Sequence, residues 1–379
     1  MQNIKNQRQS GVELLKIAAI LLIVISHVTQ TLFSPNTYVG FQDYIYEIGK
    51  STGNIQEIII NYFYYFGMTY GNTIFFVCSA WFLVGKKTTP KRKALKILID
   101  VWVVSVIWLL VFIVARHGNL PAKIVIESLF PTTFDNNWYM TCYLVFLFIF
   151  PFLNMIIERQ SQRQLLRIVF ISSLLWIFIS YVIGTHFFYT HLMAWIAIYF
   201  IIAYVKLYMP QFQNSRKANI INLLIGILGP IGLIFITNYL GYRISVFSTK
   251  LLYWNNNNSP FGILTALGAL NLCRQMKFKC AFVNYVSSLS MLAYLIHENI
   301  LFRSYTRPAI WRWIYNTFGY SHIIICILAF SIALFVLALI ASAIYKETIQ
   351  KLTSRVAMKI YNRISIIWTK AENWAVTIK

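Results

Sequence analysis

Charged side chains are scarce in this sequence, at 12% of 379 residues, and acidic ones are the scarcest, with 11 Asp and Glu against 33 Lys and Arg. Hydrophobic residues make up 58% of the chain. This composition is too apolar for a soluble domain of this length, so it excludes that class and predicts a polytopic membrane protein. The Lys and Arg residues lie in short runs between hydrophobic stretches, so the net charge of +22 does not indicate a nucleic-acid partner.

Cysteine is also rare, and its spacing matches no metal or redox motif. The five Cys lie within or beside hydrophobic stretches, where we interpret them as small packing residues. The sequence has no glycine-rich phosphate loop and no Gly-x-Ser-x-Gly elbow. The histidines at 117, 186, 191 and 322 form no closely spaced pair with a carboxylate, so we expect no metal.

Roughly ten hydrophobic stretches, most of about 17 to 25 residues, are long enough to cross a bilayer as helices. They predict an all-α bundle with transmembrane helices at residues 12–33, 58–84, 95–115, 138–157, 166–185, 191–209, 219–240, 260–273, 281–302 and 321–345. The first stretch has no small-residue cleavage site. We therefore expect it to be an uncleaved first helix rather than a signal peptide.

The distribution of Lys and Arg predicts the orientation of these helices. With both ends of the chain in the cytoplasm, about 25 of the 33 Lys and Arg lie on the cytoplasmic side. Residues 1–345 then form one membrane domain. In residues 346–379, apolar residues alternate with Lys351, Arg355, Lys359 and Arg363. This pattern predicts a basic amphipathic cytoplasmic tail that lies on anionic membrane lipids.

The first hydrophobic stretch contains the first of three groups that could carry chemistry. Glu13 and Lys16 lie near its start, and His27 lies near its far end. Eleven residues turn a helix through three revolutions and about 20° more, so Lys16 and His27 share one face, about 16 Å apart. Such residues inside a membrane face a bundle interior or cavity by default, and a neutral histidine there can act as a general base. The alternative is that Lys16 reaches the membrane edge and His27 caps the helix.

The second group is cationic and begins the third stretch: Arg92, Lys93 and Lys96. Such a cluster could hold phosphates, although the positive-inside rule alone also produces it. The third group is His297 and Glu298, a pair that is costly in an apolar segment unless it is paired or lines a cavity. Because adjacent helical residues diverge by about 100°, we predict that the two cannot point at one atom. One would serve the site and the other would orient it, or both would be solvated at the helix end.

Taken in order along the chain, these groups resemble the membrane-bound acyltransferase-3 family. The first span of that family has an Arg, ten residues and then a His, often with an acidic residue three positions before the Arg. Glu13, Lys16 and His27 match this motif, with Lys in place of Arg. The sequence FFVCSAWFL at 75–83 is similar to the family's second-span motif, and Lys93 with Lys96 resembles its Arg-x-x-Arg motif.

Two further motifs are similar to the branch of this family that modifies polysaccharides, namely NWY at 137–139 and YLIHEN at 294–299. The resemblance implies transfer of an acyl group, usually acetyl, from cytoplasmic acyl-CoA. The acceptor would be a hydroxyl of a cell-surface polysaccharide, such as an exopolysaccharide, or of a lipid-linked sugar. The protein would be a multi-pass protein of the bacterial cytoplasmic membrane and would need no metal.

The resemblance also suggests roles for individual residues. The residues that would hold the phosphates of acetyl-CoA are cationic: Lys16, Arg92, Lys93 and Lys96. His27 would take the proton of the acceptor hydroxyl, and His297 or Glu298 would orient His27 or bind the acceptor. The residues that would contact the acceptor are Glu13, Trp138 and Tyr139. Direct transfer and a covalent acyl-enzyme both stay open.

Two other functions are compatible with the same charges. A transporter or flippase of lipid-linked glycan precursors would line its pathway with them, but it is expected to have paired, interrupted helices in two corresponding halves. A polysaccharide polymerase or membrane glycosyltransferase would be expected to have a large, charged outer loop. The sequence shows neither feature, so acyl transfer is the favoured prediction.

Overall fold

The computed structural model describes residues 8–32, 49–115, 119–134, 136–183 and 190–377, and no strand occurs within these ranges. The α-helices are α1 (Ser10–Thr31), α2 (Ile55–Tyr65), α3 (Thr73–Trp81), α4 (Lys91–Ala115), α5 (Ala122–Leu129), α6 (Trp138–Arg159), α7 (Gln162–Ser173), α8 (Ser180–Ile183), α9 (His191–Tyr208), α10 (Pro210–Asn214), α11 (Arg216–Arg243), α12 (Pro260–Gln275), α13 (Ala281–His297), α14 (Arg307–Phe318) and α15 (Ile323–Thr377). Short π- or 3₁₀-helical turns join some of them: η1 (Phe66–Asn72), η2 (Leu174–Ile179), η3 (Ser245–Phe247), η4 (Phe302–Thr306) and η5 (Tyr320–His322). The predicted all-α class is confirmed.

Seven helical stretches among the described residues are long and apolar enough to cross a membrane: Ser10–Thr31, Lys91–Ala115, Trp138–Arg159, Gln162–Ile183, His191–Tyr208, Arg216–Arg243 and Tyr320–Ile367. Large apolar side chains such as Val114, Phe152 and Phe170 are exposed on the outside, as a lipid-facing surface requires. The other three predicted spans coincide with the interrupted helix α2–η1–α3 and with the shorter helices α12 and α13. The protein is therefore a multi-pass membrane bundle, whereas its number of crossings and its orientation stay predictions.

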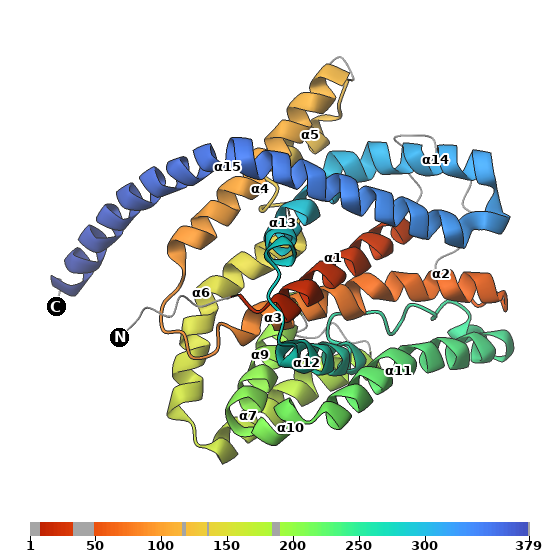
Figure 1. Ribbon diagram of the computed structural model, residues 1–379, viewed down its shortest axis with the longest axis horizontal. Helices are drawn as coiled ribbons and strands as arrows, with labels where there is room; N and C mark the ends of the chain where they lie inside the picture. Colours follow the sequence, from red (N-terminus) through yellow and green to blue (C-terminus); the bar gives the residue numbers. More distant parts are fainter. Residues whose placement is uncertain (1–7, 33–48, 116–118, 135, 184–189, 378–379) are drawn as a thin grey trace.

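Helix α1 lies in the middle of the bundle, in contact with α2, η1, α3, α12, α13, α14 and α15 (Figure 1). Its side chains are apolar around most of its circumference, and Ala19, Val24 and Val28 are completely buried. These contacts show that α1 faces other helices rather than lipid. Lys16 and His27 consequently lie where several helices converge.

The π-helical turn η1 fixes the position of α1 just before His27. A Cβ atom on Gly71 of this turn would lie 2.6 Å from Cγ1 of Ile23, so only glycine allows the two backbones to come this close. The hydroxyl of Ser26 donates a hydrogen bond to the carbonyl oxygen of Tyr64 at 2.9 Å. These contacts hold the far end of α1 against the α2–η1–α3 segment.

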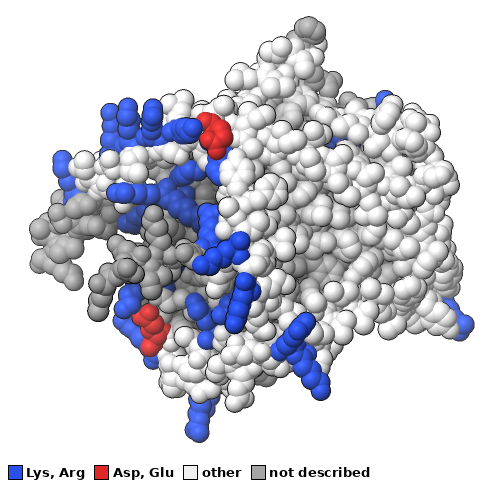
Figure 2. Space-filling view, viewed as in Figure 1, with Lys and Arg blue, Asp and Glu red and all other residues white. Residues whose placement is uncertain are grey.

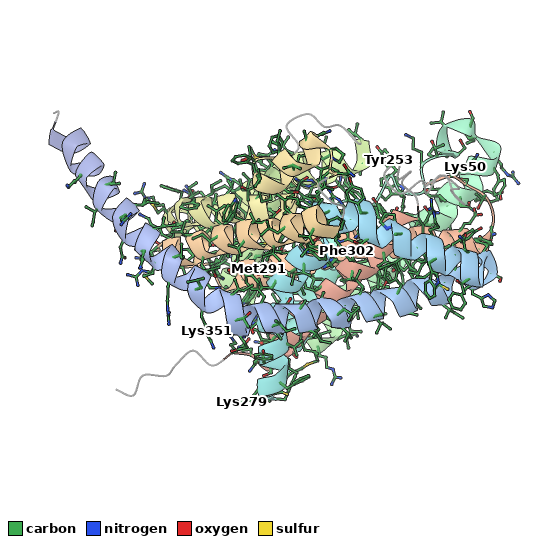
Figure 3. The ribbon with its side chains drawn as sticks, turned by 90° about the horizontal axis from the view of Figure 1, so that it is seen from above. Lys50, Tyr253, Lys279, Met291, Phe302 and Lys351 are labelled. Atoms are coloured by element: carbon green, nitrogen blue, oxygen red, sulfur yellow. The ribbon has the colours of Figure 1, made fainter. Side chains whose placement is uncertain are left out.

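Lys and Arg side chains gather at the end of the molecule where α4 begins and α15 ends (Figures 1 and 2). The rest of the face in Figure 2 carries few of them. Helix α15 continues through residue 345 without a break, and its last turns extend beyond the bundle (Figures 1 and 3). The predicted boundary between a membrane domain and a tail therefore falls inside one helix, and the contact of this extension with anionic lipids stays a prediction.

Asp100 joins α4 to α15 and is completely buried. Its Oδ1 accepts hydrogen bonds from the hydroxyls of Tyr345 (3.0 Å) and Thr353 (2.9 Å), and its Oδ2 accepts from Gln350 and Lys96, both at 3.0 Å. Four donors satisfy the lone pairs of the carboxylate, which is the condition under which a buried charge is tolerated. This cluster fixes where α15 crosses α4.

We expect the substitution Asp100→Ala to lower the free energy of unfolding by about 3 kcal/mol, because it takes the acceptor from two buried hydroxyls, the partly buried Gln350 amide and the Lys96 ammonium. Thermal unfolding of the purified protein in detergent measures this effect. The control is Thr348→Ala, which removes an exposed hydroxyl bonded only within α15 and should change stability by less than about 0.5 kcal/mol. Equal melting of the two variants would contradict the prediction.

Candidate active site

The side chains of His27, His297 and Glu298 meet at the junction of α1 and α13. Nδ1 of His27 lies 3.0 Å from Oε2 of Glu298 and 3.2 Å from Nε2 of His297. Only 15% of the His27 side chain and 6% of the Glu298 side chain are exposed, and His297 is buried. The three residues predicted to be catalytic therefore come together, although 270 positions separate His27 from His297 in the sequence.

The hydrogen bonds of this group assign the ring protons. Nδ1 of His297 lies 2.6 Å from the carbonyl oxygen of Ala293, and a carbonyl only accepts, so this nitrogen carries a hydrogen. In the neutral ring, Nε2 of His297 is then an acceptor, as is the carboxylate of Glu298. His27 must therefore donate from Nδ1. In the neutral ring of His27, Nε2 is then the unprotonated nitrogen, which is the form that a general base needs.

Two arginines neutralise Glu298. Nη1 of Arg307 lies 2.9 Å from Oε2, and Nη1 of Arg303 lies 3.2 Å from Oε1. The side chain of Arg307 is only 2% exposed, whereas that of Arg303 is 37% exposed. Cationic partners allow a buried carboxylate to stay ionised. Glu298 can then orient His27 and stabilise the imidazolium that forms when Nε2 takes a proton.

The prediction that His297 and Glu298 cannot point at one atom is wrong, since both reach Nδ1 of His27. The 100° separation holds only inside a helix. Helix α13 ends at His297, and Glu298 has φ −107° and ψ 11°, outside the α-helical range. This change of backbone direction turns the carboxylate toward the same atom as the imidazole before it.

Arg303 and Arg307 are site residues that the sequence did not predict. The charge distribution assigns both to an outer loop after the ninth span. Instead, η4 and α14 turn back against α1, where the indole nitrogen of Trp311 donates to the carbonyl oxygen of Val28 at 2.9 Å. Their signal was available in the sequence: two arginines one helical turn apart follow an acidic residue that needs a partner in an apolar segment.

Aromatic rings continue from this group toward α6. The Tyr294 ring centroid lies 6.3 Å from that of His27, and the Tyr139 ring lies 6.0 Å from Tyr294. The hydroxyl of Tyr139 is buried and has no hydrogen-bond partner among the described residues. Trp138 lies further along the same row of rings, 4.2 Å from the ring of His191. The two residues of α6 predicted to contact the acceptor therefore lie beside the site, one of them a single ring away from His27.

Glu13 and Lys16 lie at the other end of α1 and form an ion pair with a separation of 3.3 Å. Glu13 also accepts a hydrogen bond from the hydroxyl of Ser287 on α13. Glu13 thereby links α1 to α13 and holds the Lys16 ammonium. Helix α1 is unbroken from Ser10 to Thr31, so Lys16 and His27 lie on one continuous helix. A contact of Glu13 with the acceptor stays a prediction.

The three cations at the start of α4 have different surroundings. Arg92 lies over an aromatic ring of α15, with 5.2 Å between the guanidinium carbon and the ring centroid, and Lys96 pairs with Asp100. Lys93 lies within electrostatic range of Glu13. Lys93 and Lys16 are therefore both in electrostatic range of Glu13. Arg92 instead contacts α15, and Lys96 pairs with Asp100 of its own helix. Binding of phosphate by all four cations stays a prediction.

The group around His27 also has the composition of a metal site. The ligand atoms of His27, His297 and Glu298 lie within 4.8 Å of one another. A dication at this point would be repelled by the guanidinium groups of Arg303 and Arg307, which already neutralise the carboxylate. The hydrogen bonds described above account for the arrangement of the three side chains.

Comparison with known proteins identifies the family of the chain. A family model described as an acyltransferase domain, that of acyltransferase-3, matches residues 9–344, which include every residue of the site. No curated protein and no solved structure matches the chain. The matched region covers the bundle from α1 into α15, so the chain belongs to the membrane acyltransferase-3 family.

Proposed function

We propose that this acyltransferase moves an acetyl group from cytoplasmic acetyl-CoA to a hydroxyl of a cell-surface polysaccharide or a lipid-linked sugar, with His27 as general base. The observation that carries the proposal is the hydrogen-bonded arrangement of His27. Its Nδ1 hydrogen faces Glu298 and His297 at 3.0 and 3.2 Å, and its Nε2 is left to accept a proton.

In this mechanism Nε2 of His27 takes the proton of the acceptor hydroxyl as the oxygen attacks the thioester carbonyl. Glu298 stabilises the imidazolium that results. The bond formed between the acceptor oxygen and the acyl carbon is kept, and the carbon–sulfur bond breaks. The CoA thiolate that leaves takes the proton back from His27. The products are an O-acetyl ester and free CoA, and His27 returns to its starting tautomer.

The charged end of the molecule supports cytoplasmic binding of the donor. Lys16 and Lys93 lie at this end, and the positive-inside rule orients such an end toward the cytoplasm of a bacterial membrane. Tyr143 lies one helical turn after Tyr139 on α6 and within electrostatic range of Lys16, and the Tyr139 ring lies 6.0 Å from that of Tyr294, next to His27. The CoA phosphates would lie at Lys16, and the pantetheine arm would follow this line of side chains toward His27.

The acceptor would approach from the aromatic side of the site. Flat rings such as Trp138 stack on the apolar faces of sugars. The hydroxyl of Tyr139, which has no partner within the part of the chain that the structure describes, offers a donor and an acceptor to a ligand. Tyr139 lies between Trp138 and Tyr294. A sugar bound at α6 would therefore present a hydroxyl toward His27.

The O-acetyl content of surface glycan tests the proposal. Cells that carry the intact protein should acetylate the glycan, and cells that lack it should export the same glycan without acetyl groups. Purified protein in lipid nanodiscs should release CoA from acetyl-CoA only when an acceptor is present. If deletion abolishes the surface glycan itself and leaves acetylation of the remainder unchanged, transport or polymerisation is the function instead.

We expect Lys16→Ala to raise the KM for acetyl-CoA about tenfold with little change in kcat, because it removes a charge-assisted contact made equally in the ground and transition states. The substitution Lys16→Arg should restore the wild-type KM. The control is Lys123→Ala, an 81% exposed lysine of α5, which should leave both constants unchanged. A fall in kcat at unchanged KM would contradict the assignment of Lys16 to donor binding.

A further inference from the structure

Three cationic side chains gather around Trp81, at the end of α3. The guanidinium carbon of Arg274 lies 4.1 Å from the centroid of the Trp81 ring, and Nζ of Lys206 lies 5.7 Å from it. Lys206 is within electrostatic range of Arg274 and also of Lys86, in the segment that follows α3. We call Lys86, Lys206 and Arg274 the cation cluster. None of the three belongs to the donor site proposed above.

The fold holds two of these cations in place. Nζ of Lys206 donates to the carbonyl oxygens of Trp81 (2.8 Å) and Val84 (3.1 Å), at and just after the end of α3. Nη1 of Arg274 is held at 3.3 and 3.4 Å by two amide oxygens, one from α10 and one from α12. These bonds leave one hydrogen of the Lys206 ammonium, and Nη2 and Nε of Arg274, for a ligand.

The charge of the cation cluster is not compensated by a carboxylate. Within the part of the chain that the structure describes, no ion pair includes Lys86, Lys206 or Arg274. Lys206 and Arg274 are only partly exposed, so salt screens their mutual repulsion less than at an open surface. The α3 carbonyls and the Trp81 ring offset part of this charge. The remaining positive charge attracts an anion.

The cation cluster lies close to the start of α1, which carries Lys16. The backbone of Gly11 packs against the carbonyl oxygen of Cys273 on α12, so closely that a side chain at position 11 would collide with it. The Lys16 ammonium lies 5.9 Å from the centroid of the Phe82 ring, just after α3. Cys78 of α3 is within electrostatic range of both Lys16 and Cys273. Lys16 and the cation cluster therefore both border the end of α3.

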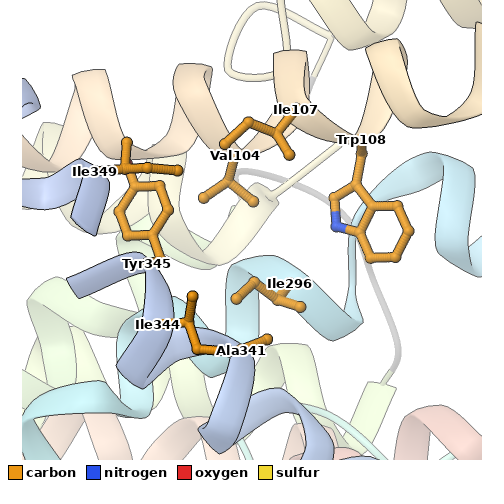
Figure 4. Close-up of a pocket in the computed structure, with 8 residues that line it drawn as sticks. All are labelled: Val104, Ile107, Trp108, Ile296, Ala341, Ile344, Tyr345 and Ile349. Carbon is orange, nitrogen blue, oxygen red and sulfur yellow. The ribbon is translucent and has the colours of Figure 1, made fainter. Parts of the chain in front are cut away.

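The apolar pocket between α4 and α15 offers no comparable site (Figure 4). Val104 and Trp108 of α4 face Ala341 and Ile344 of α15, and no cationic side chain is among the residues that line it. A phosphate placed there would lose its hydration without gaining a partner. The cations at the end of α3 provide the partners that this pocket lacks.

The two cationic groups beside α3 differ in charge, and so do the two anionic parts of CoA. Lys16 shares its charge with Glu13, whereas the cation cluster has no carboxylate partner among the described residues. Each phosphate of the CoA diphosphate carries one negative charge. The 3′-phosphate on its ribose is a monoester, with a charge of about −1.5 to −2 at pH 7. The more highly charged monoester therefore matches the cation cluster, and the diphosphate matches Lys16.

Resting on the function proposed above, we propose that the cation cluster binds the 3′-phosphate of acetyl-CoA while Lys16 binds the diphosphate. Arg274 donates to the phosphate oxygens through its remaining N–H groups, and Lys206 and Lys86 add positive charge. The cluster thereby makes the enzyme specific for CoA over thioester donors that lack this phosphate. Lys86, Lys206 and Arg274 are then specificity-determining residues of the donor site.

Donor kinetics in lipid nanodiscs test this assignment. The wild-type protein should have a KM for acetyl-CoA about tenfold below that for acetyl-3′-dephospho-CoA, because only the first donor makes the charge-assisted contacts. Arg274→Gln should raise the KM for acetyl-CoA about tenfold and leave that for the dephospho donor unchanged. The control is Arg216→Gln, at an exposed arginine of α11, which should keep the preference. A wild-type protein without a preference would overturn the proposal.

A second variant separates binding from stability, because Arg274 also packs on Trp81. Lys86 is exposed, and its main-chain carbonyl rather than its side chain binds Asn154, at 2.8 Å. Lys86→Gln should leave thermal unfolding unchanged and reduce the preference for acetyl-CoA about threefold, the effect expected of one exposed charge. A preference that is unchanged in both variants would overturn the proposal.

Titration with free CoA and with 3′-dephospho-CoA tests the site without acyl transfer. The wild-type protein should bind CoA about tenfold more tightly, and Arg274→Gln should bind the two equally. Nanodiscs of phosphatidylcholine and of phosphatidylglycerol should give the same preference. A preference that disappears in phosphatidylglycerol would assign the cation cluster to a lipid headgroup instead and overturn the proposal.

These measurements distinguish failure of this inference from failure of the proposed function. If the wild-type protein transfers acetyl from neither donor, the proposed function fails. If it uses both donors and Arg274→Gln changes their KM values equally, only the assignment of the 3′-phosphate fails.

Discussion

Replacing His27 by alanine should lower the rate of acyl transfer about 10²- to 10⁴-fold, the contribution expected of a positioned general base. The loss should appear in kcat and in kcat/KM equally, because proton removal stabilises only the transition state. Release of CoA by protein in nanodiscs measures both constants. In cells, the O-acetyl content of the glycan should match that of the deletion strain, with the variant present in the membrane in normal amount.

A matched control for this substitution is His322→Ala. His322 is exposed, and its Nδ1 contacts Ser321 and the carbonyl oxygen of Phe318 at the start of α15. Its loss should leave acyl transfer unchanged. Wild-type rates for His27→Ala would mean that another group removes the proton, and the mechanism proposed above would be wrong. If His27→Ala exports no glycan at all, His27 belongs to a transport pathway instead.

The second large effect is expected from Arg307→Leu, through stability rather than through binding. Arg307 is 2% exposed and is the nearer of the two arginines on Glu298. Removing one partner of a buried ion pair costs about 3–5 kcal/mol of the free energy of unfolding, and because Arg303 remains on Glu298 we expect the lower end, about 3 kcal/mol. Thermal unfolding in detergent should show the loss. Activity should fall as well, because Glu298 no longer holds His27 in place.

The double variant Arg307→Leu with Glu298→Gln provides the control, because it removes both charges together. It should regain a large part of the lost stability but none of the activity, since an amide cannot stabilise the imidazolium as a carboxylate does. A double-mutant cycle gives the coupling between the two residues. Stabilities that add without coupling would show that Arg307 acts independently of Glu298.

The fold and the residues that meet in the candidate site were predictable because they rest on local patterns. Hydrophobic stretches predicted the helices, and the charge and imidazole placed eleven residues apart marked α1 as the helix that carries the site. His297 and Glu298 were predictable as costly polar residues in an apolar segment. Each of these inferences uses only residues that are neighbours in the sequence.

The geometry of the site depends instead on where helices end and turn, which the sequence pattern does not specify. Glu298 reaches His27 because α13 ends at His297. A prediction that ends the helix one turn later keeps Glu298 helical and leads to the opposite conclusion, that the two side chains diverge. Arg307 would lie far from Glu298 only if the residues after the ninth predicted span formed an extended outer loop. The cluster that holds Asp100, the partner of Lys96, was not predictable, because Asp100 and its partners on α15 are 245 or more positions apart in the sequence.

The hydrogen bond from Nδ1 of His297 to the carbonyl oxygen of Ala293 has a consequence for the whole catalytic cycle. It fixes one proton on His297 and, through it, the tautomer in which His27 begins each turnover. In the proposed mechanism the proton taken from the hydroxyl leaves with CoA, so the site holds the same number of protons before and after each turnover. The reaction then draws no net proton from bulk solvent, and the thioester alone supplies the driving force.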